Sequence, residues 1–282
     1  MRGDPETRHI SINGLRLHYL EWNREGGSTM ILLHGTGDNA HVWDHFASFA
    51  PNRFRIIALD QRGHGESDWP RPPAYECGDY VNDLDKLIQS LHLEEVIIMG
   101  HSMGALHATR YAATRPSTVM GLIHVDIEPR PPSWNTKYLH GLYETLPDSY
   151  SSVKQFVDQL RETRPYANEE MIDYLAAFAI NKGSNGRFYR TFDREVLRHF
   201  DRYDLRSDLS SVICPTLIIR GEESQAMGRE AALEMSLAVS KSRLVEIPKA
   251  THPVHTDNPI QFQRVVLEFI RGFSSSTTHD TL

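Results

Sequence analysis

Residues 95–104 read EVIIMGHSMG, and an amphipathic helical pattern follows them to about residue 115. The apolar run before Gly100 is typical of a strand that is buried on both faces of a sheet. Gly100 and Gly104 lie two residues either side of Ser102, where they relieve the crowding of a tight strand-to-helix turn. Such a turn exposes the serine hydroxyl and sets the N–H of Met103 at the positive end of the helix. The stretch therefore predicts that Ser102 is a nucleophile.

Around this stretch, short apolar runs alternate with longer helical patterns. Strands are predicted at 9–12, 15–22, 29–34, 54–60, 95–100, 119–126, 215–221 and 243–248, and helices near 41–50, 78–91, 103–115, 226–238 and 259–271. This alternation predicts an α/β fold, with a mostly parallel sheet of eight strands and helices on both faces. Asn13-Gly14 between the first two strands is a hairpin signal, so we expect the sheet to begin with an antiparallel pair.

The alternation stops between Asp126 and Pro215, where three prolines mark the exit from the sheet and no strand pattern is visible. The sequence there is helical in pattern and rich in tyrosine and phenylalanine. A structureless loop of that length is uncommon in a compact domain. We therefore expect a helical cap at 131–208, inserted into a core made of 1–130 and 209–273, and a disordered low-complexity tail at 274–282.

The composition argues against several classes of function. The chain has 282 residues and a net charge of -7, which gives no reason to expect a nucleic-acid partner. No apolar run approaches the roughly 20 residues of a membrane helix, and the N-terminus has no apolar signal core. Cys77 and Cys214 are too few for a disulfide framework, so we expect a protein of the reducing cytoplasm.

Three further short motifs each come at the end of a predicted strand. His34-Gly35-Thr36-Gly37 follows a predicted strand, Asp60 to Ser67 reads DQRGHGES, and Thr251-His252-Pro253 follows the last strand. With the turn at Ser102, they make the chain resemble the α/β-hydrolase fold family, and within it the capped, single-domain serine hydrolases, over about residues 8–272.

The resemblance implies roles for several of these residues. In similar enzymes the residue after His-Gly donates its backbone N–H to the oxyanion, which here is Thr36, together with the N–H of Met103. The loop from Asp60 to Ser67 is expected to brace the site. His252 lies where the family has its general base, although Thr251 stands where the family usually has glycine.

The acid of the expected triad has more than one candidate. Many relatives place it after the seventh strand in a G-x-x-D pattern, but Ser224 occupies that aspartate position here. Other relatives place it at the end of the sixth strand, where this chain has Asp126. An unpaired carboxylate is unfavourable at the end of an apolar strand, so Asp126 is preferred. Glu223 and Glu222 remain alternatives, followed by Glu128.

The sequence thus predicts a serine hydrolase that cleaves a carboxylic ester, or a related acyl bond, of a small-molecule substrate. Hydrolysis of an amide, enamide or C–C bond in a carboxylate-bearing metabolite remains open, as does a receptor without turnover. Five cap arginines could bind such a carboxylate, although charged cap residues are usually solvated: Arg130, Arg161, Arg164, Arg187 and Arg190. His255 is the competing histidine, but no metal site and no cofactor are expected. The oligomeric state is left open.

Overall fold

The computed structural model describes residues 3–200 and 203–273, and it contains an eight-stranded sheet in the order β1-β2-β4-β3-β5-β6-β9-β10. The strands are β1 (Glu6–Ile12), β2 (Leu15–Trp22), β3 (Ser28–Leu33), β4 (Phe54–Leu59), β5 (Val96–His101), β6 (Val119–Val125), β9 (Thr216–Gly221) and β10 (Ser242–Ile247). The predicted α/β class and strand number are confirmed.

The direction of the strands follows the local sequence signals. β1 and β2 form the expected antiparallel hairpin around Asn13-Gly14, and β2 also runs antiparallel to β4. From β4 to β10 all neighbours in the sheet are parallel. Because β3, β5 and β6 are buried along nearly their whole length, they are apolar without alternation. Their carboxyl ends therefore meet at one edge, where loops can converge.

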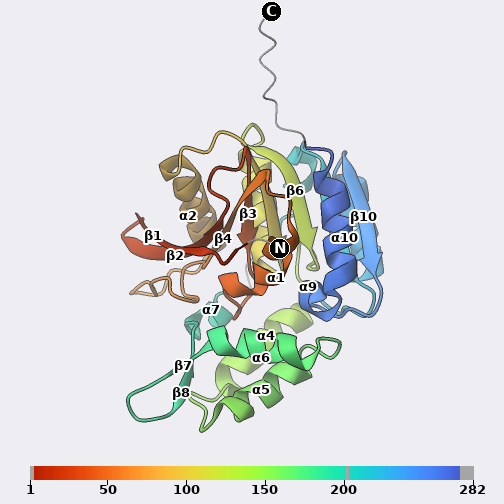
Figure 1. Cartoon of the computed structure of the whole chain (residues 1–282). Helices are drawn as coiled ribbons and strands as arrows, with labels where there is room; N and C mark the ends of the chain where they lie inside the picture. The colour runs from red at the N-terminus through yellow and green to blue at the C-terminus, as the bar shows by residue number, and fades with distance from the viewer. Residues whose placement is uncertain (1–2, 201–202, 274–282) are drawn as a thin grey trace, which may run out of the picture.

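Helices cover both faces of the sheet. One face packs on α1 (Asp44–Phe49) and α10 (Pro259–Ile270), through side chains such as Phe46 and Phe262. The other packs on α2 (Cys77–Ser90), α3 (Met103–Thr114) and α8 (Arg229–Ala238), through Leu84, Ala108 and Met235. The structure is thus a three-layer arrangement (Figure 1).

Between β6 and β9 the chain leaves the sheet and forms a separate layer at the carboxyl ends of the strands (Figure 1). This layer, called the cap below, contains α4 (Ser133–Thr145), α5 (Val153–Glu162), α6 (Glu169–Ala179), β7 (Ile180–Lys182), β8 (Phe188–Arg190) and α7 (Glu195–Arg198). The hairpin of β7 and β8 corrects the expectation that this segment lacks strands. Asn185-Gly186 was the available turn signal, but strands of three residues are too short to show alternation.

Smaller differences concern short helical turns. The helix expected near 41–50 begins as a 3-10 turn, η1 (Ala40–Trp43), and a single-turn α9 (Val254–Asp257) lies just after His252. The tail expected to be disordered, 274–282, lies outside the described residues. In the part of the chain that the structure describes, no helix is both long and apolar enough to span a bilayer.

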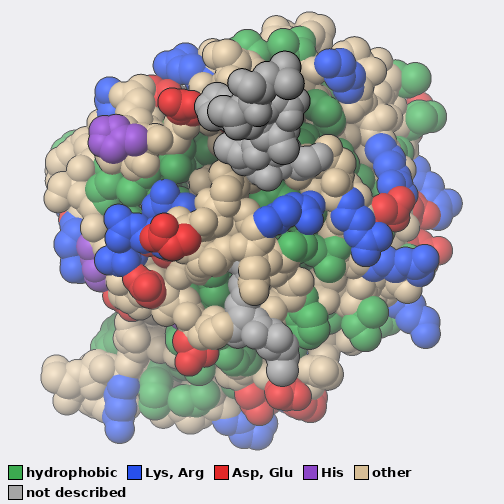
Figure 2. Space-filling model, turned by 45° about the horizontal axis from the view of Figure 1, so that its top comes forward, with side chains coloured by type: hydrophobic (Ala, Val, Ile, Leu, Met, Phe, Trp, Pro, Cys, Tyr) green, Lys and Arg blue, Asp and Glu red, His purple; other side chains and the backbone are tan. Residues whose placement is uncertain are grey.

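The surface is mixed in charge. Figure 2 shows one face, on which basic and acidic side chains lie near one another. Ion pairs at the surface include Arg243 with Glu268 and Arg115 with Asp85. Such exposed pairs contribute little to stability, about 0–1 kcal/mol each.

Candidate active site

Ser102 lies in the turn between β5 and α3, with φ 52° and ψ −124°, a conformation that few non-glycine residues adopt. The turn is possible only because its neighbours lack side chains. A Cβ on Gly100 would lie 2.2 Å from the carbonyl oxygen of Gly104, and one on Gly104 would lie 2.5 Å from that of Leu33. Both glycines are therefore required by the backbone itself, which explains the spacing seen in the sequence.

The structure brings Ser102, His252 and Asp126 together. His252 Nε2 lies 2.9 Å from Ser102 Oγ, and His252 Nδ1 lies 2.9 Å from Asp126 Oδ2. A carboxylate beside Nδ1 fixes the tautomer, so Nδ1 donates to Asp126 and Nε2 accepts from the serine hydroxyl. Ser102 is 7% exposed and Asp126 is fully buried. The arrangement is one in which a serine proton can move to an imidazole supported by a carboxylate.

Asp126 is held by more than the histidine. Its Oδ1 accepts from the backbone N–H of Gly221 at 2.8 Å, and its Oδ2 also accepts from the Ser224 hydroxyl. Ser224, at the position of the usual family acid, therefore contacts the carboxylate that lies against His252. We did not anticipate this contact, although the polar residue at that position was a signal for it.

The alternative acids lie elsewhere. Glu222 and Glu223 are exposed, and Glu223 accepts a hydrogen bond from the Tyr166 hydroxyl of the cap. Glu128 accepts from the backbone N–H of Gly228 at 3.1 Å. Among these acids, Asp126 is the one that contacts His252, so geometry favours the end of the sixth strand of the core.

The segment expected to form an oxyanion hole lies against the serine. Gly35 is so close that a Cβ there would be 3.1 Å from Ser102 Cβ, and Thr36 follows it. Met103 is the first residue of α3, so its N–H has no partner inside the helix. The two candidate donors are therefore on segments that meet at the nucleophile.

The loop from Asp60 to Ser67 braces this region. The Asp60 carboxylate is buried and accepts from the backbone N–H of Ala40 and of Glu66, at 2.6 and 2.8 Å, and it pairs with His18. Burial alone would raise the pKa of Asp60, but the hydrogen bond and charge of His18, together with His34 and the backbone N–H of Glu66, lower it on balance. Asp60 thus ties its own loop to η1, next to the Thr36 segment.

Two further histidines flank the base. His101 Nε2 donates to the carbonyl oxygen of His252 at 2.9 Å, which joins the nucleophile turn to the loop of the base. His255, the competing candidate, is buried and stacked on Trp43. Burial lowers the pKa of His255 to about 3 and that of His101 well below its usual value, so both are neutral near pH 7. Neither ring nitrogen of His255 has a hydrogen-bond partner among the described residues, so His255 does not bind Ser102.

Thr251, the departure from the family's glycine, is accommodated by Asp257. The Asp257 carboxylate accepts from both the backbone N–H and the hydroxyl of Thr251. The loop before His252 is therefore held by a side chain from α9.

The cap contacts the Thr36 segment at three successive residues. A Cβ on Gly37 would touch the Phe192 ring, Asp38 pairs with Arg164, and the Asn39 amide donates to the carbonyl oxygen of Phe178 at 3.0 Å. The Arg164 and Asp38 side chains are only 9% and 15% exposed.

The five cap arginines differ in exposure, and no sequence signal separated them. Arg130 and Arg187 are exposed, as charged cap residues usually are, and Arg161 is half-buried. Arg164 is buried, and Arg190 lies over the Tyr150 ring.

Neither cysteine belongs to this arrangement, and the described residues do not form a metal site. Cys77 and Cys214 are free, and burial raises the pKa of the Cys77 thiol to about 11. Within residues 3–200 and 203–273, no group of three or more His, Cys, Asp or Glu side chains is arranged to hold a metal ion.

Comparison with known proteins identifies the family of the chain. A model of the alpha/beta hydrolase fold matches residues 28–259, which is most of the chain. The chain belongs to the α/β-hydrolase fold family. This α/β-hydrolase has curated relatives that match nearly its whole length.

The 2-(acetamidomethylene)succinate hydrolase of Mesorhizobium japonicum is 28% identical over 268 residues, covering 94% of this chain and 95% of the relative. The crystal structure of an E-2-(acetamidomethylene)succinate hydrolase matches with a TM-score of 0.86 and 26% identity, covering 95% of this chain and 99% of that one. Epoxide hydrolase 1 of Caenorhabditis elegans is 23% identical, covering 95% of this chain and 71% of the relative. The expectation that this chain is a hydrolase of the family is confirmed.

Proposed function

We propose that this α/β-hydrolase is a serine hydrolase that cleaves a carboxylic ester, or a related acyl bond, of a small molecule through an acyl-enzyme. The observation that carries the proposal is the chain of two 2.9 Å contacts from Ser102 through His252 to Asp126. A serine hydroxyl is a weak nucleophile without such a base.

In the proposed first step, Ser102 Oγ forms a bond to the substrate carbonyl carbon while its proton moves to His252 Nε2. Asp126 stabilises the resulting imidazolium. The backbone N–H groups of Thr36 and Met103 donate to the oxyanion, and losing one such donor typically lowers the rate about 100- to 1000-fold. The bond to the leaving group then breaks, and His252 gives that group its proton.

The second step mirrors the first. Water loses a proton to His252 Nε2 and attacks the acyl carbon, and the returning proton regenerates the Ser102 hydroxyl. The cap lies at the carboxyl ends of the strands, where substrates of open α/β sheets bind, so we assign it the role of a lid over the acyl group.

Serine at the turn argues against the chemistry named for the epoxide hydrolase relatives. Opening an epoxide by covalent catalysis suits a carboxylate nucleophile, which is already ionised, whereas the Ser102 hydroxyl needs a base. An acyl-enzyme formed from a carbonyl substrate is therefore the supported route.

A second candidate is hydrolysis of an amide or enamide in a carboxylate-bearing metabolite. It is favoured by the 28% identity and the TM-score of 0.86 to the 2-(acetamidomethylene)succinate hydrolases. The same triad would attack the acyl carbon, and His252 would protonate the leaving nitrogen.

The test is a burst experiment with a p-nitrophenyl ester of a short acid. Wild type is expected to release p-nitrophenol in a burst followed by steady turnover, and a fluorophosphonate should label Ser102. Ser102→Ala should lose both labelling and turnover. A single slow turnover with a ligand-induced shift in Tm would instead indicate a receptor, and full labelling of Ser102→Ala would refute the assignment. The ratio of ester to enamide turnover then distinguishes the two candidates.

A further inference from the structure

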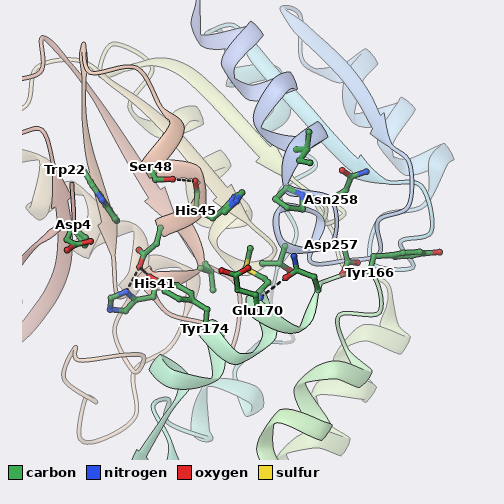
Figure 3. A pocket seen from close by; sticks show the side chains of 18 of the residues that line it. Asp4, Trp22, His41, His45, Ser48, Tyr166, Glu170, Tyr174, Asp257 and Asn258 are labelled. Atoms are coloured by element: carbon green, nitrogen blue, oxygen red, sulfur yellow. Dashed lines mark hydrogen bonds and ion pairs between the residues drawn. The ribbon is translucent and has the colours of Figure 1, made fainter. Parts of the chain in front are cut away.

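A cavity of about 560 Å³ lies between the core and the cap (Figure 3). Its core side comes from η1, α1 and α9, with His41, Asp44 and Asp257, and its cap side includes Glu170 and Tyr174 of α6. Neither Ser102 nor His252 lines it. The volume is within the range of small-molecule sites.

The cavity is acidic. Four carboxylates line it, from Asp4, Asp44, Glu170 and Asp257, and none of the described residues that line it is a lysine or arginine. The cationic candidates are two histidines. Burial lowers the pKa of His45, against the opposing charge of Glu170, so it is neutral near pH 7.

One of these carboxylates is buried without full compensation. Asp257 is 6% exposed, and its Oδ2 accepts both hydrogen bonds from Thr251. Its Oδ1 has no donor among the described residues. This oxygen has almost no accessible surface, so a ligand cannot contact it directly. A buried carboxylate is nevertheless stabilised by positive charge nearby, and Asp257 lines the cavity, so a cation held there would act on its charge through space. Asp44 repeats the pattern, since its Oδ2 contacts His41 and Tyr174 while Oδ1 has no described donor.

Aromatic rings line the same space. Trp22 is buried at the core side, whereas Tyr166 and Tyr174 of the cap are each 41% exposed. Carboxylates together with aromatic faces favour an organic cation over an anion or a neutral sugar. A bare metal ion fits poorly, because no described group of three potential ligands is arranged to hold one.

We propose that this cavity is a second ligand site, which binds a small organic cation: an ammonium or guanidinium group on an apolar body. The cationic group lies near Glu170 and the Asp257 carboxylate, and the apolar body lies beside Tyr174, which is on the same helix as Glu170. Because the lining comes from both the core and the cap, the bound cation joins one to the other.

The test uses three probes with one ring and different charges: benzylammonium, benzyl alcohol and benzoate. Binding to the full chain is measured by calorimetry and by the shift in Tm, at pH 7. We expect benzylammonium to bind most tightly, benzyl alcohol more weakly and benzoate not at all. Ser102→Ala should bind benzylammonium as wild type does, which separates this site from the proposed catalytic function.

Adjacent glutamates provide a matched pair of variants. Glu170→Gln should weaken benzylammonium binding by about threefold to fivefold, as expected for an exposed charge pair. Glu169 does not line the cavity and pairs with Arg161, so Glu169→Gln should leave the Kd unchanged. Asp257→Asn keeps an oxygen for Thr251 and removes a negative charge beside the cavity, so it should weaken binding by about tenfold through the lost electrostatic attraction.

Three results would overturn the proposal. One is equal binding of the three probes, or none by any. Another is an unchanged Kd in both Glu170→Gln and Asp257→Asn, provided that the wild-type Tm is retained. The third is protection of Ser102 from a fluorophosphonate by benzylammonium, which would put the cation in the catalytic pocket instead.

Discussion

Replacing Asp126 by Asn is the perturbation that tests the proposed triad most directly. Asp126 has φ 55°, and asparagine tolerates this left-handed conformation, so the backbone can be kept. The change removes the negative charge 2.9 Å from His252 Nδ1 and leaves the side chain nearly the same size.

The expected magnitude follows from the contacts of the carboxylate. Asp126 accepts from Gly221, Ser224 and His252, so it receives three donors. An asparagine has one acceptor oxygen and an NH₂ that only donates. The NH₂ would therefore face at least one of these three donors without a hydrogen bond, or would favour the imidazole tautomer in which Nδ1 accepts and Nε2 carries the proton. We expect kcat to fall by about 10⁴-fold, the scale of a neutralised triad acid, which is about 5.5 kcal/mol of transition-state stabilisation.

The assay is steady-state hydrolysis of a p-nitrophenyl ester, with circular dichroism to show that the variant is folded. Glu223→Gln is the matched control, because Glu223 is exposed and contacts Tyr166; it should cost less than about tenfold. Adding Ser224→Asp to Asp126→Asn should recover at least about tenfold, since residues in contact couple. A large loss in Glu223→Gln with a small one in Asp126→Asn would refute the reasoning.

Three further predictions concern the frame of the site. Gly104→Ala should destabilise the protein by about 2 kcal/mol or more, because the added Cβ would lie 2.5 Å from a backbone oxygen. A Cβ added at Gly141 has no atom within 4 Å, so Gly141→Ala should stabilise the protein slightly. Chemical denaturation measures both changes. Burial lowers the pKa of His64 to about 3 in the folded protein, whereas its pKa in the unfolded chain is about 6.5. Between these two pH values only the unfolded state binds the proton, so Tm should decrease as the pH falls below about 6.5. A Tm that does not change with pH in this range would contradict the prediction. Arg164→Met leaves Asp38 unpaired and should lower kcat/KM by about tenfold. Adding Asp38→Asn should recover part of the loss, because removing one partner of a buried pair is worse than removing both. No recovery would mean that the pair does not support the site.

Much of the core could be predicted from the sequence because burial leaves a local trace. Strands that are buried on both faces must be apolar throughout, so β3, β5 and β6 could be recognised without their neighbours. The turn at Ser102 was recognisable because backbone contacts alone demand its two glycines. The β7–β8 hairpin was missed since three residues a strand leave no period to detect.

The site was less predictable where a role depends on distant partners. Asp126 and Glu223 are both carboxylates after strands, and only the packed structure shows that one is buried against His252 while the other faces Tyr166. Arg164 could not be separated from the exposed cap arginines, because its burial depends on Asp38, which is 126 residues away. Pairings of this kind have no sequence period, so they come only from the tertiary structure.

The contacts of Gly37, Asp38 and Asn39 with the cap have a consequence for protein engineering. A cap without contacts to the core could be exchanged between relatives by itself. Here three successive residues beside Thr36 contact one particular cap, so a chimera with a foreign cap would lose the support of that backbone. Transferring a new specificity to this scaffold therefore requires exchanging residues 37–39 together with the cap.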